Sequence, residues 1–390
     1  MTERTVVLTD LAENVWLERC TLSARDGVSL AGSDAWSITK STLRGGVSDG
    51  VDVVELDNGR LSVSVLPTRG MGLWRGECDG VRLGWSSPVT RPVHPQFVRL
   101  SDESGLGWLT GFNEWLCRCG LQFMGPPCDD GGLPVTLHGR IANRPAHRVE
   151  ARVNSDGPGT LEVTGVVDET LMFLCNLRLT STLRTEAGSN RILIIDEVEN
   201  RGGRPAEFEL LYHINQGPPL LAEGASFSAP VRELAPRDDA AAEGIDMWTR
   251  FEAPTAGYAE QVFYMLLHGD ADGNTLVLLK NAAGDKGLSL RFNLRELPYF
   301  IFWKETQPEA DGYVTGLEPA TALPNDKPFE REQGRLITLD PGARHRMQLQ
   351  LAVHTAAAAV ADVERQIAEL QTAGEPTVHR RPTVPFSPEK

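Results

Sequence analysis

Apolar residues recur at every second position in many short segments of the chain. Leu61, Val63 and Val65 alternate with serines, and turn-forming residues such as Asp-Asn-Gly at 57–59 separate segments of this kind. The same period of two returns at 161–165, 177–183, 208–212, 288–294 and 347–353. This period is that of a strand with one buried face, and many short strands joined by turns pack as two antiparallel sheets. The sequence therefore predicts an all-β protein.

The two ends of the chain differ from this pattern. Residues 360–370 carry apolar side chains at three- and four-residue spacing among good helix formers, which predicts a short helix, and a Pro-rich tail without a core pattern follows. Residues 1–50 alternate only weakly, and neither a repeat nor a linker divides the remainder. We expect an N-terminal extension packed on the main body (1–50), one β domain (51–355), and a C-terminal helix with an extended tail (356–390).

Composition narrows the class of protein. The 390 residues are 41% apolar and 23% charged, so the chain can bury a large core and is not intrinsically disordered. The formal net charge of −15 argues against nucleic acid and anionic membranes as partners. No apolar stretch approaches the length of a membrane span or a signal-peptide core, and six cysteines are too few for a disulfide scaffold. We expect a soluble cytoplasmic monomer or homodimer.

Three segments place polar side chains at breaks in the strand pattern. Arg69 lies in a Gly-containing kink between apolar runs, where a β-bulge with a surface arginine is the plain alternative. Asn113 and Glu114 stand between two aromatic residues, an arrangement that suits a sugar ring with one apolar face. Lys304, one of few lysines, ends an aromatic run, although an ordinary ion pair with a nearby glutamate would explain it equally. These four residues are candidates for a binding pocket.

Histidines mark two further segments. His138, Arg140, Arg144 and His147 form the densest cationic cluster of an acidic chain, where a solvated loop is the alternative. His213 ends a predicted strand that runs into a Gly-Pro turn, although a lone strand histidine is commonly a core residue.

A zinc site built on Cys117, Cys119, Cys128 and His138 is disfavoured. Structural zinc sites usually place paired cysteines two to four residues apart, whereas one residue separates the first two here. Buried free thiols fit better, and we expect no metal.

Taken in order, several segments resemble the aldose 1-epimerase (galactose mutarotase-like) superfamily, and most closely a poorly characterised aldose-1-epimerase-like branch of it. They are Leu66–Gly72, His138–Asn143, the strand-end His213, and Gly316–Pro319 followed by Asn325, within residues 50 to 353. The resemblance implies a β-supersandwich of two large antiparallel sheets, here the catalytic domain at 51–355.

The resemblance also implies a reaction and its residues. Members of this superfamily interconvert sugar anomers without a cofactor, which would make Glu318 the base and His213 the acid, with His138 and Arg140 binding sugar hydroxyls. Acid–base assistance of this kind opens and recloses the hemiacetal ring. Arg69, Asn113, Glu114 and Lys304 have no counterpart in the superfamily motif and rest on the local argument alone.

Two other functions remain open from the sequence. The same acid and base would serve a sugar isomerase, epimerase or lyase that removes a C–H proton, with or without a metal. A non-catalytic carbohydrate-binding protein would also keep the fold. Anionic sugars would fit if Arg69, Arg140, Arg144 and Lys304 shared one pocket. Each of the enzymatic functions considered requires His138, His213 and Glu318 to meet in one cleft.

Overall fold

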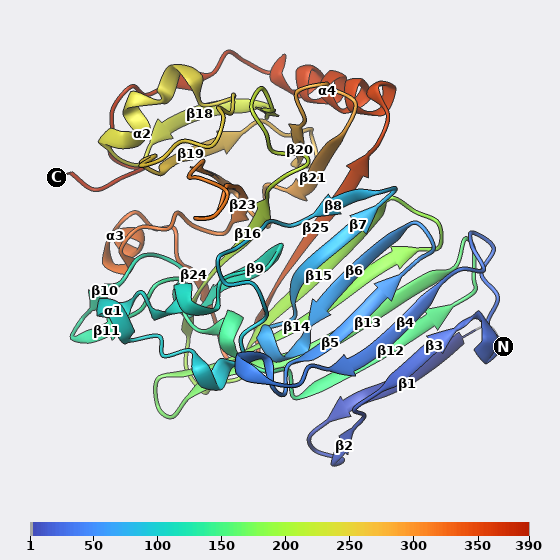
Figure 1. Cartoon of the computed structure of the whole chain (residues 1–390). Helices are drawn as coiled ribbons and strands as arrows, with labels where there is room; N and C mark the ends of the chain where they lie inside the picture. Colours follow the sequence, from blue (N-terminus) through green and yellow to red (C-terminus); the bar gives the residue numbers. More distant parts are fainter. Residues whose placement is uncertain (1–2, 390) are drawn as a thin grey trace.

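The computed structural model describes residues 3–389 and consists mainly of two large antiparallel sheets stacked face to face (Figure 1). The first sheet has ten strands. In spatial order they are β17 (Ser226–Ser228), β20 (Asn274–Lys280), β21 (Gly287–Asn293), β25 (Arg344–His354), β15 (Arg191–Asn200), β14 (Cys175–Glu186), β13 (Thr160–Leu171), β12 (Arg148–Asn154), β1 (Glu3–Asp10) and β2 (Val15–Trp16).

The second sheet has fourteen strands and carries the site described below. Its order is β26 (Thr377–Val378), β18 (Val231–Pro236), β19 (Gln261–Leu267), β22 (Tyr299–Glu305), β23 (Val314–Ala320), β16 (Ala206–Gln216), β9 (Leu116–Leu121), β7 (Gly72–Cys78), β6 (Leu61–Leu66), β5 (Asp52–Asp57), β4 (Ser37–Thr42) and β3 (Cys20–Ser23). In addition, β24 (Ile337–Leu339) pairs with β16 and β8 (Val81–Leu83) with β7.

Smaller elements complete the chain. A hairpin of β10 (Cys128–Asp130) and β11 (Leu133–Val135) stands apart from both sheets. The helices are α1 (Asp102–Gly105), α2 (Asp239–Glu243), α3 (Lys327–Glu332) and α4 (Ala357–Gln371). Within residues 3–389, no helix is long and apolar enough to cross a membrane.

The main core lies between the two sheets, as the alternating pattern predicts. Leu61, Val63 and Val65 are buried there against inward-facing residues of the opposite sheet such as Leu161 and Val163. The inner face of each strand thus supplies the apolar contacts, and this burial is the main stabilising term of the sandwich.

One charged cluster crosses this apolar core. Arg118 on β9 donates hydrogen bonds to Asp196 on β15 (Nη2 to Oδ1, 3.0 Å) and to Ser181 on β14 (2.8 Å). Tyr212 on β16 donates to the other oxygen of Asp196 at 2.9 Å. Because all four side chains are buried and hydrogen-bonded to one another, the cluster joins the two sheets without leaving these charges unpaired.

The N-terminal region differs from the predicted extension. Strand β1 pairs with β12 at one edge of the first sheet, whereas β3 and β4 continue the second sheet beyond β5. Leu8, Leu22 and Ile38 belong to the shared core. Residues 1–50, as far as described, therefore contribute edge strands to both sheets. Weak alternation is typical of such edges because fewer of their side chains face the core.

The C-terminal region begins as predicted and ends differently. Helix α4 packs Val360, Val363 and Ile367 on β20 of the first sheet. The Pro-rich segment 382–388, predicted to be extended over the surface, is anchored on the outer face of the second sheet, where Phe386 is only 3% exposed. Figure 1 shows this segment ending on the side of the molecule that carries α2 and α3.

Side chains of the preceding loops hold this segment in place. Asn325 and Arg335 donate hydrogen bonds to the carbonyl oxygens of Phe386 (2.9 Å) and Pro385 (2.8 Å). The hydroxyl of Ser387 donates to the carbonyl oxygen of Arg237 at 3.0 Å. A single apolar anchor and scattered polar contacts give no sequence period, which explains why the pattern along the chain did not reveal this packing.

Candidate active site

A cavity of about 530 Å³ opens on the outer face of the second sheet. Its floor comes from the central strands β16, β22 and β23. Its walls come from the loops before β9 and α3, from residues 126–127 and 137–138, and from the C-terminal segment 382–388. Its aromatic and ionisable lining residues are Trp108, Phe112, His138, His213, Arg237, Glu260, Trp303, Glu318 and Asp326.

Strand register brings His213 and Glu318 together. The pairs Leu211–Ala320 and Ile214–Leu317 between β16 and β23 set His213 opposite Glu318 on the outer face. His213 Nε2 lies 3.4 Å from Glu318 Oε1, and the two residues are 5% and 3% exposed. Glu318 Oε1 has no hydrogen-bond partner among the described residues. A buried carboxyl and a buried imidazole thus face each other at the cavity floor.

Gly316 makes room for this pair. It precedes Glu318 by two positions on β23, so both face the cavity. A Cβ atom at position 316 would lie only 2.1 Å from Glu318 Oε1. Any side chain here would push the carboxyl away from His213.

Burial sets the protonation of the three central groups. Desolvation raises the pKa of Glu318 well above its ordinary value, with a further rise from Glu260 and an opposing effect of Arg237. It lowers the pKa of His213 to about 3 and that of His138 to about 4. Burial thus favours the uncharged form of all three groups, a carboxylic acid and two neutral imidazoles.

His138 lies beside this pair and completes the polar groups of the floor. Its ring centroid is 5.6 Å from that of His213, and its Nδ1 lies 2.8 Å from the carbonyl oxygen of Met124. Because a carbonyl oxygen only accepts, Nδ1 carries the hydrogen and Nε2 is left as an acceptor. His138 can therefore accept a hydrogen bond from a ligand hydroxyl.

Aromatic rings surround His213. Phe112 and Trp303 lie 5.2 and 5.3 Å from it between ring centroids, and Trp108 lies 6.3 Å away. The indole of Trp303 donates a hydrogen bond to Glu260 at 2.9 Å. Such flat apolar surfaces beside a few polar groups suit a sugar ring.

Arg237 lies at the rim of the cavity. It donates to Glu260 at 2.7 Å and forms an ion pair with Asp238 at 2.8 Å. Among the described residues that line the cavity, Arg237 is the single arginine or lysine, and both of its carboxylate partners are already in place. The cavity therefore offers no free cation to an anionic ligand.

Lys304 is not part of the cavity, in contrast to the sequence prediction. Its Nζ donates to the carbonyl oxygens of Arg250 (2.7 Å) and Met247 (3.3 Å) instead of pairing with a glutamate. Side chains alternate along β22, so Trp303 faces the cavity and Lys304 faces away from it. The neighbouring Trp303 therefore lines the cavity, and Lys304 does not.

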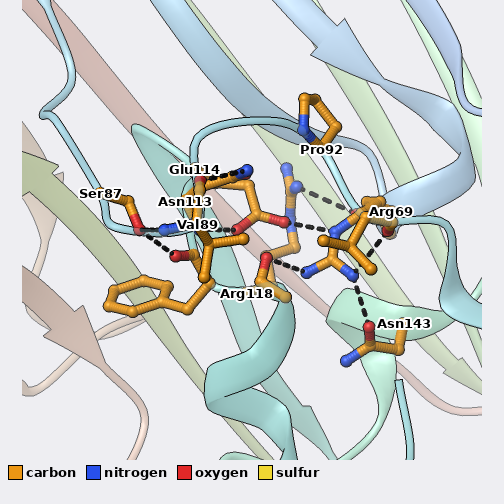
Figure 2. Close-up of polar contacts among 12 residues, drawn as sticks. Arg69, Ser87, Val89, Pro92, Asn113, Glu114, Arg118 and Asn143 are labelled. Carbon is orange, nitrogen blue, oxygen red and sulfur yellow. Dashed lines mark hydrogen bonds and ion pairs between the residues drawn. The ribbon is translucent and has the colours of Figure 1, made fainter. Parts of the chain in front are cut away.

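Arg69, Asn113 and Glu114 also lie outside the cavity lining. Figure 2 shows Arg69 held between Glu114 and Asn143: its Nε donates to Glu114 Oε1 at 2.6 Å and its Nη1 to Asn143 Oδ1 at 2.5 Å. The side chains of Arg69 and Glu114 are fully buried. Asn113 donates to the carbonyl oxygen of Val89. These side chains are thus held by other protein groups, and none of the three reaches the cavity lining.

The cationic cluster predicted from the sequence does not form one pocket. His138 and Gly139 both have positive φ, at 56° and 69°, and the chain turns so that Arg140 lines a separate cavity of about 790 Å³. Arg144 donates to the carbonyl oxygen of Thr170. Of the four cations proposed for an anionic sugar, namely Arg69, Arg140, Arg144 and Lys304, none lines the cavity of His213.

The cysteines are free thiols. Cys117 and Cys119 are buried on the outer face of β9, and Cys117 pairs with His213 across the strands. Among residues 3–389, no group of three or more His, Cys, Asp or Glu residues is arranged to hold a metal ion.

The chain is similar to proteins of one fold family. The model of DUF4432, a domain of unknown function, matches residues 48–353. A solved structure from Klebsiella pneumoniae subsp. pneumoniae, provisionally named an aldose 1-epimerase, is 36% identical, with a TM-score of 0.95 over 98% of this chain and 99% of that chain. No curated protein matches.

More distant structures share the fold. A galactose mutarotase-like protein from Clostridium acetobutylicum is 14% identical, with a TM-score of 0.55 over 82% of this chain and 98% of that chain. A galactose 1-epimerase from Lactobacillus acidophilus is 14% identical, with a TM-score of 0.52 over 82% and 99%. The predicted galactose mutarotase-like sandwich is therefore confirmed.

Proposed function

The chain belongs to the DUF4432 family and has the fold of aldose 1-epimerase-like proteins, and on this premise we propose that it is a mutarotase of a free, uncharged sugar. The observation that carries the proposal is the pair of His213 and Glu318, 3.4 Å apart on the floor of an aromatic-walled cavity. No cofactor is needed for the chemistry proposed.

Ring opening requires two proton transfers, one at each of the two oxygens bonded to the anomeric carbon C1. The anomeric hydroxyl loses its proton while the ring oxygen gains one, and both oxygens are bonded to C1. An acid and an acceptor that lie side by side can contact both oxygens from the same face of the sugar. Positioned acid–base groups contribute about 10²–10⁴-fold in rate.

The remaining cavity residues would bind the substrate. His138 Nε2 would accept a hydrogen bond from a sugar hydroxyl, and Trp108, Phe112 and Trp303 would cover the apolar face of the ring. The cavity lacks a free cation, which favours a neutral sugar over a sugar phosphate or sugar acid.

The test is anomer exchange with the purified protein. Exchange of several aldoses, measured by NMR and corrected for the spontaneous reaction, should be accelerated by the wild type. Glu318→Gln should lose at least about a hundredfold of this acceleration, the order expected for an acid–base group. A Glu318→Gln protein that retains full rate would refute the assignment.

Glu209→Gln provides the matched control. Glu209 lies four residues before His213 on β16 and is equally buried, but it does not line the cavity. The same substitution there should leave the exchange rate unchanged.

The same experiment in D₂O separates the alternatives. Mutarotation exchanges only oxygen-bound protons, so deuterium at a sugar carbon would assign the protein to C–H proton transfer instead. Ligand-induced thermal stabilisation without any turnover would indicate a carbohydrate-binding protein.

A further inference from the structure

Asn215 holds the imidazole of His213 in one orientation. It follows His213 by two residues on the same face of β16, and its Oδ1 lies 2.6 Å from His213 Nδ1. Its Nδ2 donates to the carbonyl oxygens of Glu114 (2.9 Å) and of His213 itself (3.2 Å). Because two carbonyl oxygens accept at this end, the amide nitrogen must lie there and the amide oxygen must face the imidazole.

This orientation determines which nitrogen of His213 carries the hydrogen. The amide oxygen of Asn215 only accepts, so His213 Nδ1 is the N–H and the neutral ring leaves a lone pair on Nε2. That lone pair faces Glu318 Oε1, an atom with no other partner among the described residues. A carboxylate would be repelled there, whereas a carboxylic acid can donate to Nε2.

We propose that Asn215 is a positioning residue that keeps His213 as the Nδ1–H tautomer, so that His213 Nε2 is the base and Glu318 the acid of ring opening. This proposal rests on the proposed mutarotase function. It reverses the roles that the family resemblance implies for these two residues.

The proton transfers balance in both directions. In ring opening, His213 Nε2 takes the proton of the anomeric hydroxyl, the C1–O1 double bond forms, and the C1–O5 bond breaks with its electron pair going to O5. Glu318 then supplies the proton of O5. In reclosure Glu318 takes the O5 proton as O5 attacks C1, and the imidazolium returns its proton to O1. Both groups regain their starting states after each cycle.

A buried layer supports Asn215. The carbonyl oxygen of Glu114, which accepts from Asn215, also accepts from the indole of Trp85 at 3.1 Å. The side chain of Glu114 is fixed by Arg69 and by the backbone N–H of Asn113. Figure 2 shows Arg69, Asn113 and Glu114 of this layer. Through the carbonyl oxygen of Glu114, which accepts from Asn215, the layer supports the orientation of His213.

Few other ionisable groups face His213. Glu318 faces it from β23, Cys117 from β9 and His138 from the turn at 138–139. The nearest rim charges, Arg237 and Glu260, act on Glu318. The tautomer therefore depends mainly on Asn215 and Glu318.

The first test is the tautomer itself, read by long-range ¹H–¹⁵N correlation spectra of the full-length protein at pH 7. His213→Gln identifies the His213 signals by their loss. The wild type should show a protonated Nδ1 and an unprotonated Nε2. A wild-type His213 protonated on Nε2 would overturn the proposal, whatever the protein does with sugars.

The second test uses two substitutions of Asn215. Asn215→Leu removes the acceptor, so the Nε2–H tautomer should become populated and kcat should fall about tenfold to a hundredfold with little change in KM. Asn215→Asp keeps an acceptor and favours imidazolium, so the tautomer should persist while the acid limb of the kcat/KM profile moves to higher pH. If Asn215 had only a structural role, its substitution would change neither the tautomer of His213 nor the pH profile of kcat/KM.

The outcomes separate this inference from the proposed function. If the wild type has the expected tautomer but accelerates no anomer exchange, the mutarotase proposal fails and the positioning role stands. If Asn215→Leu does not fold, the wild-type and Asn215→Asp spectra decide. Unchanged tautomer and pH profile in folded Asn215→Leu and Asn215→Asp would refute the role of Asn215.

Discussion

Glu209 allows the effect of burial on a carboxyl group to be measured apart from function. It is 1% exposed, and neither of its side-chain oxygens has a hydrogen-bond partner among the described residues. Burial raises the pKa of Glu209 from an ordinary 4.5 to about 8, against an opposing effect of Lys327. The folded protein must therefore keep this group protonated at neutral pH.

The free-energy cost of keeping Glu209 protonated follows from the difference between its pKa in the folded state and its pKa in the unfolded state. An acid with a higher pKa in the folded state destabilises the fold as pH rises from its unfolded value to its folded value, here from 4.5 to about 8. Each pH unit in this window costs about 1.4 kcal/mol. At pH 7 the cost is roughly 3 kcal/mol, and near pH 4 it vanishes.

Glu209→Gln should remove this cost, because an amide has no proton to lose. We expect the free energy of unfolding at pH 7 to increase by about 3 kcal/mol, and the gain to disappear near pH 4. Urea unfolding followed by tryptophan fluorescence from pH 4 to 8 measures both. Glu309→Gln, at an exposed position, should change little at any pH. If the free energies of unfolding of the wild type and Glu209→Gln differed by the same amount at every pH, the reasoning would be refuted.

Three other substitutions test the site and its support. Gly316→Ala should displace the Glu318 carboxyl, because its Cβ would lie 2.1 Å from Oε1, and anomer exchange should fall at least about tenfold, toward the loss of one acid–base group. Arg69→Met leaves the fully buried carboxylate of Glu114 unpaired, so unfolding free energy measured in urea should fall by about 3–5 kcal/mol. Phe386→Ala removes the anchor of the C-terminal wall, so KM for the sugar should rise more than kcat falls, as steady-state kinetics will show.

Each of these variants has a control elsewhere in the structure. Gly203→Ala adds a methyl group where no atom lies within 4 Å, and Phe97→Ala alters a ring that is 49% exposed. Arg60→Met breaks an exposed ion pair with Asp79. If a control lowers activity or stability as much as its counterpart, the corresponding local explanation fails.

The sequence predicts the sandwich well because its physical cause is periodic. Leu61, Val63 and Val65 alternate in the chain and lie buried between the sheets, so a local pattern reports a global arrangement. The pairing of His213 with Glu318 has no such local signal. It depends on the register of β16 and β23. The local pattern marks His213 as a strand-end histidine, but only the resemblance to a family connected it with Glu318.

Side-chain direction explains why several predicted binding residues lie outside the cavity. Within one strand, Trp303 and Lys304 differ by a single position and face opposite sides of the sheet, so the choice between them requires the strand register. Arg69 and Glu114 look like binding groups because they are charged and lie near glycines and aromatic residues. Their mutual ion pair, which holds both side chains away from the cavity, joins positions too far apart in the chain for a local pattern to reveal.

One wall of the cavity is formed by residues near the end of this chain, 382–388. The shape of the cavity therefore depends on whether this segment has been synthesised and on whether it has been cut off by a protease. Strands β16 and β23 leave the ribosome before residues 382–388, so the acid–base pair can be folded while one side of the cavity is still open. Arg380 and Arg381 are exposed just ahead of this segment. A trypsin-like cut after Arg380 would separate the wall from the sheets without breaking any strand that carries His213, Trp303 or Glu318. Limited digestion would thus produce a folded protein with a wider entrance, able to admit longer saccharides than the intact chain.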